Sequence, residues 1–237
     1  MPESFDRSPP VRTEPDLDPE DWETFRTAAH AALDLAFDYM AGSRSRPVWQ
    51  PTPETARAAL ATGLPAAGMP LDTVVRAFEE HVMPYATGNL HPRFMGWVHG
   101  GGNPAGLVGE MLAAGLNANL GGRDHAPIAV ERQVVGWMAE AFGLPPSTAG
   151  LLVTGTSIAN LIAVLVARAV HAGVSVLHDG VAGHRLTAYT SVAAHGCIPR
   201  AMDMAGLGTA ALRMIGTDPD GRIETAALAD AIARDRA

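Results

Sequence analysis

The chain has 237 residues, 47% of them hydrophobic, which is enough apolar material for one large globular domain or two smaller ones. Its formal net charge is −8 and its arginines are scattered, which argues against a basic face for nucleic acid. The single cysteine, Cys197, excludes an internal disulfide and a cysteine-cluster metal site. We expect it to be a small packed side chain rather than a reactive thiol.

The N-terminus has no basic region followed by an apolar run, so no secretory signal is predicted. Apolar stretches such as residues 160–170 are shorter than the roughly 20 residues of a membrane span. We therefore expect a cytoplasmic protein that does not bind membranes. Residues 1–18 are rich in proline and acidic side chains and are expected to form an extended arm.

The N-terminal part of the chain is predicted to be almost wholly helical. Asp18 is a plausible N-cap with Pro19 at the first helical position, and apolar residues then recur at spacings of three and four. A proline-rich connector and a glycine-rich patch separate the later helices. The predicted helices of this part span residues 18–42, 53–61, 71–85, 105–116 and 128–142.

The pattern changes at Gly150, where short apolar runs begin to alternate with helical segments. This rhythm favours an α/β fold with a mostly parallel sheet and helices on both faces. A turn is expected at residues 218–221. The predicted strands are residues 151–153, 187–191 and 211–215, and the predicted helices are residues 158–172, 198–205 and 225–236.

The strongest motif is Val153-Thr-Gly-Thr-Ser-Ile-Ala-Asn160. A strand that ends in glycine and small hydroxylated residues, with a helix starting at once, presents N–H groups, hydroxyls and the positive end of the helix dipole to one point. That point suits a phosphate, and Gly155, Thr156 and Ser157 are the candidate binding residues. An ordinary helix N-cap by Thr156 or Ser157 is the alternative. A nucleotide P-loop is excluded because no Gly-Lys-Ser/Thr is present.

His195 is the second candidate site residue. It follows the predicted strand 187–191, at the end of a parallel sheet where ligands bind. The next residue, Gly196, leaves room for a flat ligand to approach. A packed or capping histidine is the alternative.

Together these motifs resemble the group II decarboxylases that depend on pyridoxal 5'-phosphate (PLP), which include the aromatic-L-amino-acid and glutamate decarboxylases. The similar segments follow the family's order over residues 20–237. They are His91-Pro-Arg-Phe-Met-Gly-Trp97, Arg123-Asp-His-Ala-Pro127 leading into Glu131-Arg-Gln-Val-Val-Gly-Trp-Met138, Thr154-Gly-Thr-Ser-Ile-Ala-Asn160 and Ala194-His-Gly196. The third looks like the family's Ser-Gly-Gly-Thr-Glu-Ala-Asn phosphate cradle, with Thr156 and Ile158 in place of the frequent glycine and glutamate.

The resemblance implies a fold-type I PLP-dependent transferase-like architecture. Residues 1–90 would be a helical arm used in dimerisation, and residues 91–237 the first part of the large PLP-binding domain. Gly155, Thr156 and Ser157 would hold the cofactor phosphate, and His195 would stack on the pyridine ring and act in catalysis. The substrate pocket of such an enzyme would be lined by Trp97, Val98 and His99, and its substrate would be an amino acid.

The chain contains no lysine, because all 17 of its Lys and Arg side chains are arginine. An enzyme of this family holds PLP as a Schiff base on lysine, chemistry that a guanidinium does not perform. We therefore expect a second, C-terminal polypeptide to supply that lysine and the aspartate for the pyridine nitrogen, and the completed unit to dimerise. The alternative is a non-catalytic partial fold that binds PLP weakly or acts as an interaction module.

A metal site is not expected. His91, His99 and His125 lie near one another in the sequence, but their spacings match no usual ligand pattern and few carboxylates accompany them.

Overall fold

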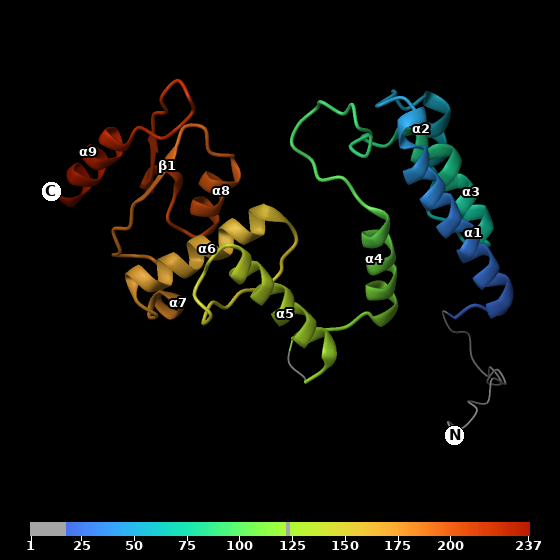
Figure 1. The fold of residues 1–237 in the computed structure, drawn as a ribbon, viewed down its shortest axis with the longest axis horizontal. Coiled ribbons are helices and arrows are strands. Elements are labelled where there is room, and N and C mark those ends of the chain that lie inside the picture. The colour runs from blue at the N-terminus through green and yellow to red at the C-terminus, as the bar shows by residue number, and fades with distance from the viewer. Residues whose placement is uncertain (1–17, 122–123) are drawn as a thin grey trace. The chain divides into compact units, whose positions relative to one another are not determined.

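The computed structural model describes residues 18–121 and 124–237, so most of the predicted N-terminal arm lies outside the described residues. The chain divides into two compact units, residues 1–118 and 119–237, and each unit is described by itself (Figure 1). The predicted assignment of residues 1–90 to dimerisation and 91–237 to cofactor binding stays a prediction.

The described part of unit 1 is helical, as predicted, and α1, α2 and α3 pack together (Figure 1). The predicted helix 71–85 is divided, because Val82 departs from regular helix geometry and Pro84 lacks the N–H that would continue it. The elements are α1 (Trp22–Ala41), the 3₁₀ turn η1 (Gly42–Ser45), α2 (Glu54–Leu60), α3 (Leu71–His81), η2 (Met83–Tyr85) and α4 (Pro104–Leu116).

Helix α1 begins later than predicted. Its N-cap is Asp21, not Asp18, and the Asp21 carboxylate accepts hydrogen bonds from the backbone N–H groups of Glu23 at 2.9 Å and Thr24 at 3.2 Å. The Thr24 hydroxyl donates to the same carboxylate at 2.6 Å. These bonds, the hydroxyl bond first, hold the pKa of Asp21 below its ordinary value. The signal favouring Asp18 was Pro19, which lies before the helix.

The proline-rich connector after α1 is fastened to the segment that precedes His91. Gly88 lies so close to the connector that a Cβ there would be 1.6 Å from the carbonyl oxygen of Val48, and its φ of +79° is one that glycine adopts readily. The Gln50 side chain donates to the carbonyl of Pro84 at 3.0 Å. Glycine is therefore required at position 88 both by space and by conformation.

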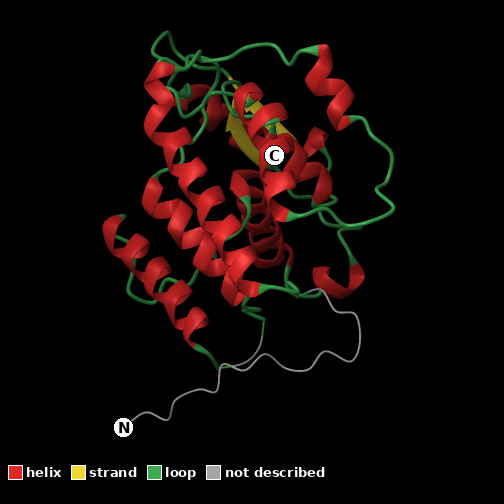
Figure 2. Ribbon diagram, turned by 90° about the vertical axis from the view of Figure 1, so that its right-hand side faces the viewer, coloured by secondary structure: helices red, strands yellow, loops and turns green. Residues whose placement is uncertain are grey.

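Unit 2 has the α/β character that the sequence predicts. Strands β1 (Ala188–Ser191) and β2 (Leu212–Ile215) pair in parallel, with Ala188 opposite Leu212 and Ser191 opposite Ile215. Figure 2 shows the two strands in yellow among helical segments. The predicted turn at 218–221 is confirmed, and the short helix α7 was not predicted. The helices are α5 (Ala126–Ala141), α6 (Gly155–Ala172), α7 (Val176–Asp179), α8 (Cys197–Met204) and α9 (Thr225–Arg236), with a 3₁₀ turn η3 (Thr209–Ala211).

The prediction of a strand at residues 151–153 is wrong, because these residues form no regular secondary structure. A strand needs a neighbour to satisfy its backbone groups, and no described segment pairs with these residues. Instead the N–H of Leu152 donates to a carboxylate oxygen of Glu131 on α5 at 3.0 Å. A side chain of a helix therefore holds the approach to the 154–160 motif.

The core of unit 2 centres on α8 and β2. The buried side chains there belong to Cys197, Ala201, Met202, Leu212 and Ile215, which confirms the prediction that Cys197 is packed. Many large apolar side chains are exposed instead, and α6 has no buried residue although it is long and apolar enough to cross a membrane by length and composition. Length and composition do not by themselves distinguish such a span from the core helix of a globular domain, which passes the same test when it is mostly buried.

An ion-pair network joins α9 to both strands. Arg213 on β2 donates from Nη2 to Asp235 Oδ1 at 2.8 Å and from Nε to Oδ2 at 3.0 Å, and the hydroxyl of Tyr189 on β1 donates to the same carboxylate at 2.9 Å. The Arg213 bonds first, and then the Tyr189 bond, hold the pKa of Asp235 below its ordinary value.

We expect Asp235→Asn to lower the thermal unfolding midpoint of unit 2 at pH 7, because the variant loses the charge that Arg213 and Tyr189 contact. A carboxyl group with a lowered pKa stabilises the fold above its unfolded pKa of about 3.9 and loses this contribution as the pH falls through the lowered value. The difference between wild type and variant should therefore shrink below about pH 4, as followed by circular dichroism.

Asp230→Asn is the matched control, because Asp230 also lies on α9 but is exposed and forms no hydrogen bond or ion pair within the residues that the structure describes. An equal effect of the two substitutions would contradict the role given to the Arg213–Asp235–Tyr189 network.

Candidate cofactor site

The first part of the candidate site is the N-terminus of α6. Thr154 is its N-cap, with an extended backbone and no hydrogen bond from its side chain to the helix. Gly155 follows with a φ of +81°, where glycine is favoured, and a Cβ added there would have no neighbouring atom within 4 Å. Thr156 and Ser157 lie inside the first helical turn, so the alternative in which one of them is the N-cap is wrong.

The groups at this helix end have the chemistry of a phosphate site. Thr156 and Ser157 are exposed, and their hydroxyls form no hydrogen bond with the residues that the structure describes. The first-turn N–H groups lack a side-chain cap, and the first turn carries no acidic residue. The N–H of Gly155 donates to the carbonyl of Val153 at 3.0 Å, so the donors left are the N–H groups and hydroxyls of Thr156 and Ser157. With the positive end of an 18-residue helix they favour a dianion. The donor set therefore fits a cofactor phosphate.

The second part of the site is His195, in the turn between β1 and α8. Its ring nitrogen Nδ1 accepts a hydrogen bond from the backbone N–H of Cys197 at 3.1 Å, so the imidazole caps the start of α8. The alternative prediction, that His195 is a capping residue, is therefore confirmed for its Nδ1 edge. The residue is nevertheless exposed, so the ring is not packed in the core. Its Nε2 edge has no partner among the described residues.

A contact between α6 and α8 brings the two parts together. The side-chain amide of Asn160 on α6 donates to the sulfur of Cys197 on α8 at 3.3 Å. Asn160 lies one turn along the helix from Thr156 and Ser157, and Cys197 lies two residues after His195. The packing of α6 against α8 therefore brings the 154–160 motif and His195 into the same part of unit 2.

The residues expected to line the substrate pocket belong to unit 1, where two of them form an aromatic cluster with Phe94. Trp97 donates from Nε1 to Nε2 of His99, and the ring of His99 stacks on Phe94 with centroids 5.9 Å apart. Phe94 meets Trp97 edge to face, also at 5.9 Å. Val98 is fully exposed and takes no part in the cluster.

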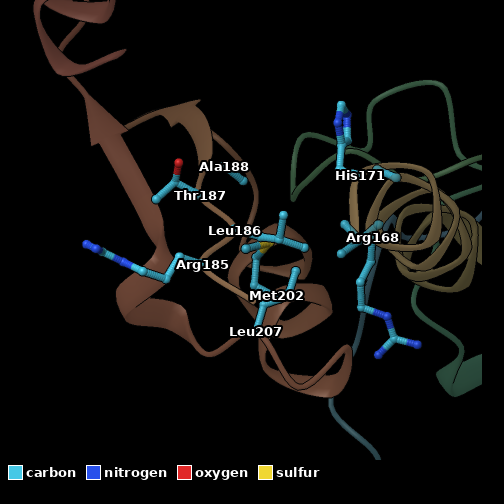
Figure 3. A pocket seen from close by; sticks show the side chains of 10 residues that line it. Arg168, His171, Arg185, Leu186, Thr187, Ala188, Met202 and Leu207 are labelled. Carbon is cyan, nitrogen blue, oxygen red and sulfur yellow. The ribbon is translucent and has the colours of Figure 1, made fainter. Parts of the chain in front are cut away.

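A pocket of about 400 Å³ in unit 2 contains none of the predicted site residues (Figure 3). Its apolar lining includes Leu186 and Met202, whereas the charged ends of Arg168 and Arg185 point away from each other. In the described parts of the chain, no group of three His, Cys, Asp or Glu side chains is placed to hold a metal ion.

The fold is that of part of a fold-type I PLP-dependent domain. The sequence model described as "Pyridoxal-dependent decarboxylase conserved domain" matches residues 53–237, so the chain belongs to this family. Aromatic-L-amino-acid decarboxylase of Bacillus atrophaeus is 30% identical over 90% of the chain, and tryptophan decarboxylase 1 of Oryza sativa subsp. japonica is 27% identical over 89%. The chain spans 44% of each of these relatives, which is less than half of their length.

Solved structures agree with this assignment. The structure of Oryza sativa TDC with PLP and tryptamine has a TM-score of 0.79 and 26% identity, over 93% of this chain and 48% of that one. Catharanthus roseus tryptophan decarboxylase in complex with L-tryptophan has a TM-score of 0.78 and 25% identity, over 92% and 47%. The cofactor of the family is PLP, as predicted.

Three contact residues of the site were not singled out from the sequence. Phe94 lies in the 91–97 segment and Asn160 in the 154–160 motif, both of which resemble the family. Their ring and amide contacts depend on packing, which the sequence pattern does not show. Glu131 was quoted as part of a helix, and its bond to Leu152 spans 21 residues. Arg123, in the segment that resembles the family before that helix, lies outside the described residues.

Proposed function

We propose that this chain is the N-terminal part of a PLP-dependent decarboxylase that converts an L-amino acid to its amine and carbon dioxide. A second polypeptide, which carries the Schiff-base lysine, would complete the enzyme. The observation that carries the proposal is the joining of an open phosphate-binding helix end to an exposed histidine through the contact of Asn160 with Cys197.

The start of α6 would hold the cofactor by its phosphate. The hydroxyls and backbone N–H groups of Thr156 and Ser157 would donate hydrogen bonds to it, and Gly155 keeps a Cβ out of the approach. Charge-assisted hydrogen bonds of this kind contribute about 1.5–3 kcal/mol each. Ile158, in place of the glutamate frequent in the family, keeps a negative charge away from the phosphate.

PLP, once bound, would supply an electron sink for the charge left when the carboxylate departs, which is chemistry that side chains lack. His195 would support it from this chain by covering the flat ring with its exposed imidazole. Because Nδ1 accepts from Cys197, the neutral ring carries its proton on Nε2. That nitrogen could then hold or deliver a proton close to the substrate α-carbon.

An aromatic L-amino acid is the substrate class that we propose. Trp97 is exposed on unit 1 beside His99 and Phe94 and offers a flat apolar wall. The curated relatives named above decarboxylate aromatic amino acids by name, which supports the same choice. A glutamate side chain would gain less from such a wall than an indole or phenol ring.

The second polypeptide accounts for two features of the chain. The absence of lysine means that a Schiff base on a lysine must come from elsewhere. Large apolar side chains also stay exposed in unit 2, among them Leu151, Leu152 and Val166. Exposed apolar patches of this kind mark surfaces that other protein covers. We propose further that the completed unit forms a homodimer through its N-terminal helices.

The proposal is tested by purifying the protein from its natural source through a tag on this chain. Intact mass would count the polypeptides, and labelled carbon dioxide released from carboxyl-labelled L-tryptophan, L-tyrosine and L-glutamate would report the reaction. We expect a lysine-bearing second polypeptide, absorbance of bound PLP, and release from the aromatic substrates above that from glutamate.

Three other results would each contradict one part of the proposal. A single longer polypeptide with aromatic decarboxylase activity would contradict the second polypeptide but not the reaction. This chain alone, with neither activity nor tight PLP binding, would favour the non-catalytic interaction module. Preference for glutamate would contradict the aromatic substrate class.

A further inference from the structure

We propose that Asn160 and Cys197 are positioning residues that fix the location and tautomer of the His195 imidazole relative to the phosphate-binding end of α6. The inference rests on the proposed function for its catalytic consequence, because it concerns how His195 is held for the reaction. The structural part of it, a coupling from Asn160 through Cys197 to His195, is independent of that function.

The first step is the bond across the two helices. The Asn160 amide donates to Cys197 Sγ at 3.3 Å, and only 5% of the Cys197 surface is exposed. The partly buried amide N–H would lose its acceptor if the sulfur moved, and an unsatisfied donor in such surroundings is costly. The bond therefore favours one placement of the first residue of α8.

The second step runs from Cys197 to the histidine. The backbone N–H of the same cysteine donates to Nδ1 of His195 at 3.1 Å. An acceptor nitrogen cannot carry a proton, so this bond selects the neutral ring with its proton on Nε2. A residue whose side chain is held by α6 thus determines which ring nitrogen of His195 is free to act as a donor.

The third step is the location of Asn160 on α6. It follows Ser157 by three residues and Thr156 by four, so it lies on the same face of the helix as both predicted phosphate donors. The bond between Asn160 and Cys197 therefore fixes the position of His195 relative to Thr156 and Ser157. A second bond, from Arg168 Nη1 on α6 to the carbonyl of Ala205 at 2.6 Å, holds the C-terminal end of α8, whereas the Asn160 bond holds the end next to His195.

The experiment compares Cys197→Ala, Cys197→Ser and Asn160→Leu in the complete protein. Serine keeps an acceptor for the Asn160 amide, alanine does not, and leucine removes the donor with little change in shape. Ring ¹⁵N shifts of protein in which only this chain is histidine-labelled report the tautomer, and His195→Gln identifies the His195 signals among those of its nine histidines. Circular dichroism confirms that each variant is folded.

Wild type and Cys197→Ser are expected to show the Nε2–H tautomer of His195. Cys197→Ala and Asn160→Leu should show mixed tautomers and a kcat lowered by about three- to tenfold, the factor for one neutral hydrogen bond, with KM nearly unchanged. Unchanged His195 shifts in both of these variants would overturn the inference, whether or not the protein is a decarboxylase. Altered shifts in a protein without decarboxylase activity would support the coupling and contradict the proposed function instead.

Discussion

Replacing His195 with alanine is expected to lower decarboxylation in the complete enzyme by about 10²–10⁴-fold, the usual contribution of a positioned acid–base group. The imidazole is exposed and anchored at Nδ1, so its loss removes a ring face and a proton donor from the site. Single-turnover measurement of carbon dioxide release would show the effect on kcat rather than on substrate binding.

The same substitution should have a much smaller effect on folding. It removes the cap on the N–H of Cys197, and losing a helix cap costs about 0.5–2 kcal/mol. His184→Ala is the matched control, because His184 is exposed in the same unit and its side chain has no hydrogen bond within the described residues. Equal activity of the His195→Ala and wild-type enzymes would reject the catalytic assignment.

Replacing Ser157 with alanine is expected to weaken PLP binding by about tenfold or more, since one charge-assisted bond contributes about 1.5–3 kcal/mol. The hydroxyl has no partner in the described chain, so its loss should leave the stability of α6 almost unchanged. Equilibrium dialysis of the complete enzyme against PLP would measure the dissociation constant.

Ser147→Ala provides the comparison for Ser157, because Ser147 is an exposed turn residue of the same unit outside the site. Inorganic phosphate should compete with PLP for the wild-type protein and less effectively for the Ser157 variant. If both serine variants bind PLP as wild type does, the 154–160 motif is a helix start without a role in cofactor binding.

Helices and the later strands could be predicted from the sequence because their signals are local. Apolar spacing located α5 and α9 to within two residues, and the runs that became β1 and β2 were assigned correctly. The strand expected at 151–153 failed because a strand exists only with a neighbour, and no described segment supplies one. The start of α1 was misplaced because two aspartates lie close together before it, and only the backbone decides which one caps.

The residues of the candidate site could be predicted from the sequence, but the contacts that join them could not. Glycine and hydroxyl spacing located the helix end that carries Thr156 and Ser157, and a histidine after a strand located His195. The link between them depends on how α6 packs against α8, and a contact 37 residues apart in the chain leaves no local pattern. The Phe94–Trp97–His99 cluster lies in unit 1, whereas the 154–160 motif and His195 lie in unit 2.

The bond from Leu152 to Glu131 assigns the segment before α6 to the same cooperative unit as α5. Local unfolding in proteins proceeds by groups of residues that open together, and hydrogen exchange reveals these groups. Because the Leu152 amide is held by a side chain of α5 and not by a strand, opening of α5 frees that amide while β1 and β2 stay paired. Order in the segment before α6 is thus a property of helix α5, through a contact residue that lies 21 residues earlier in the chain.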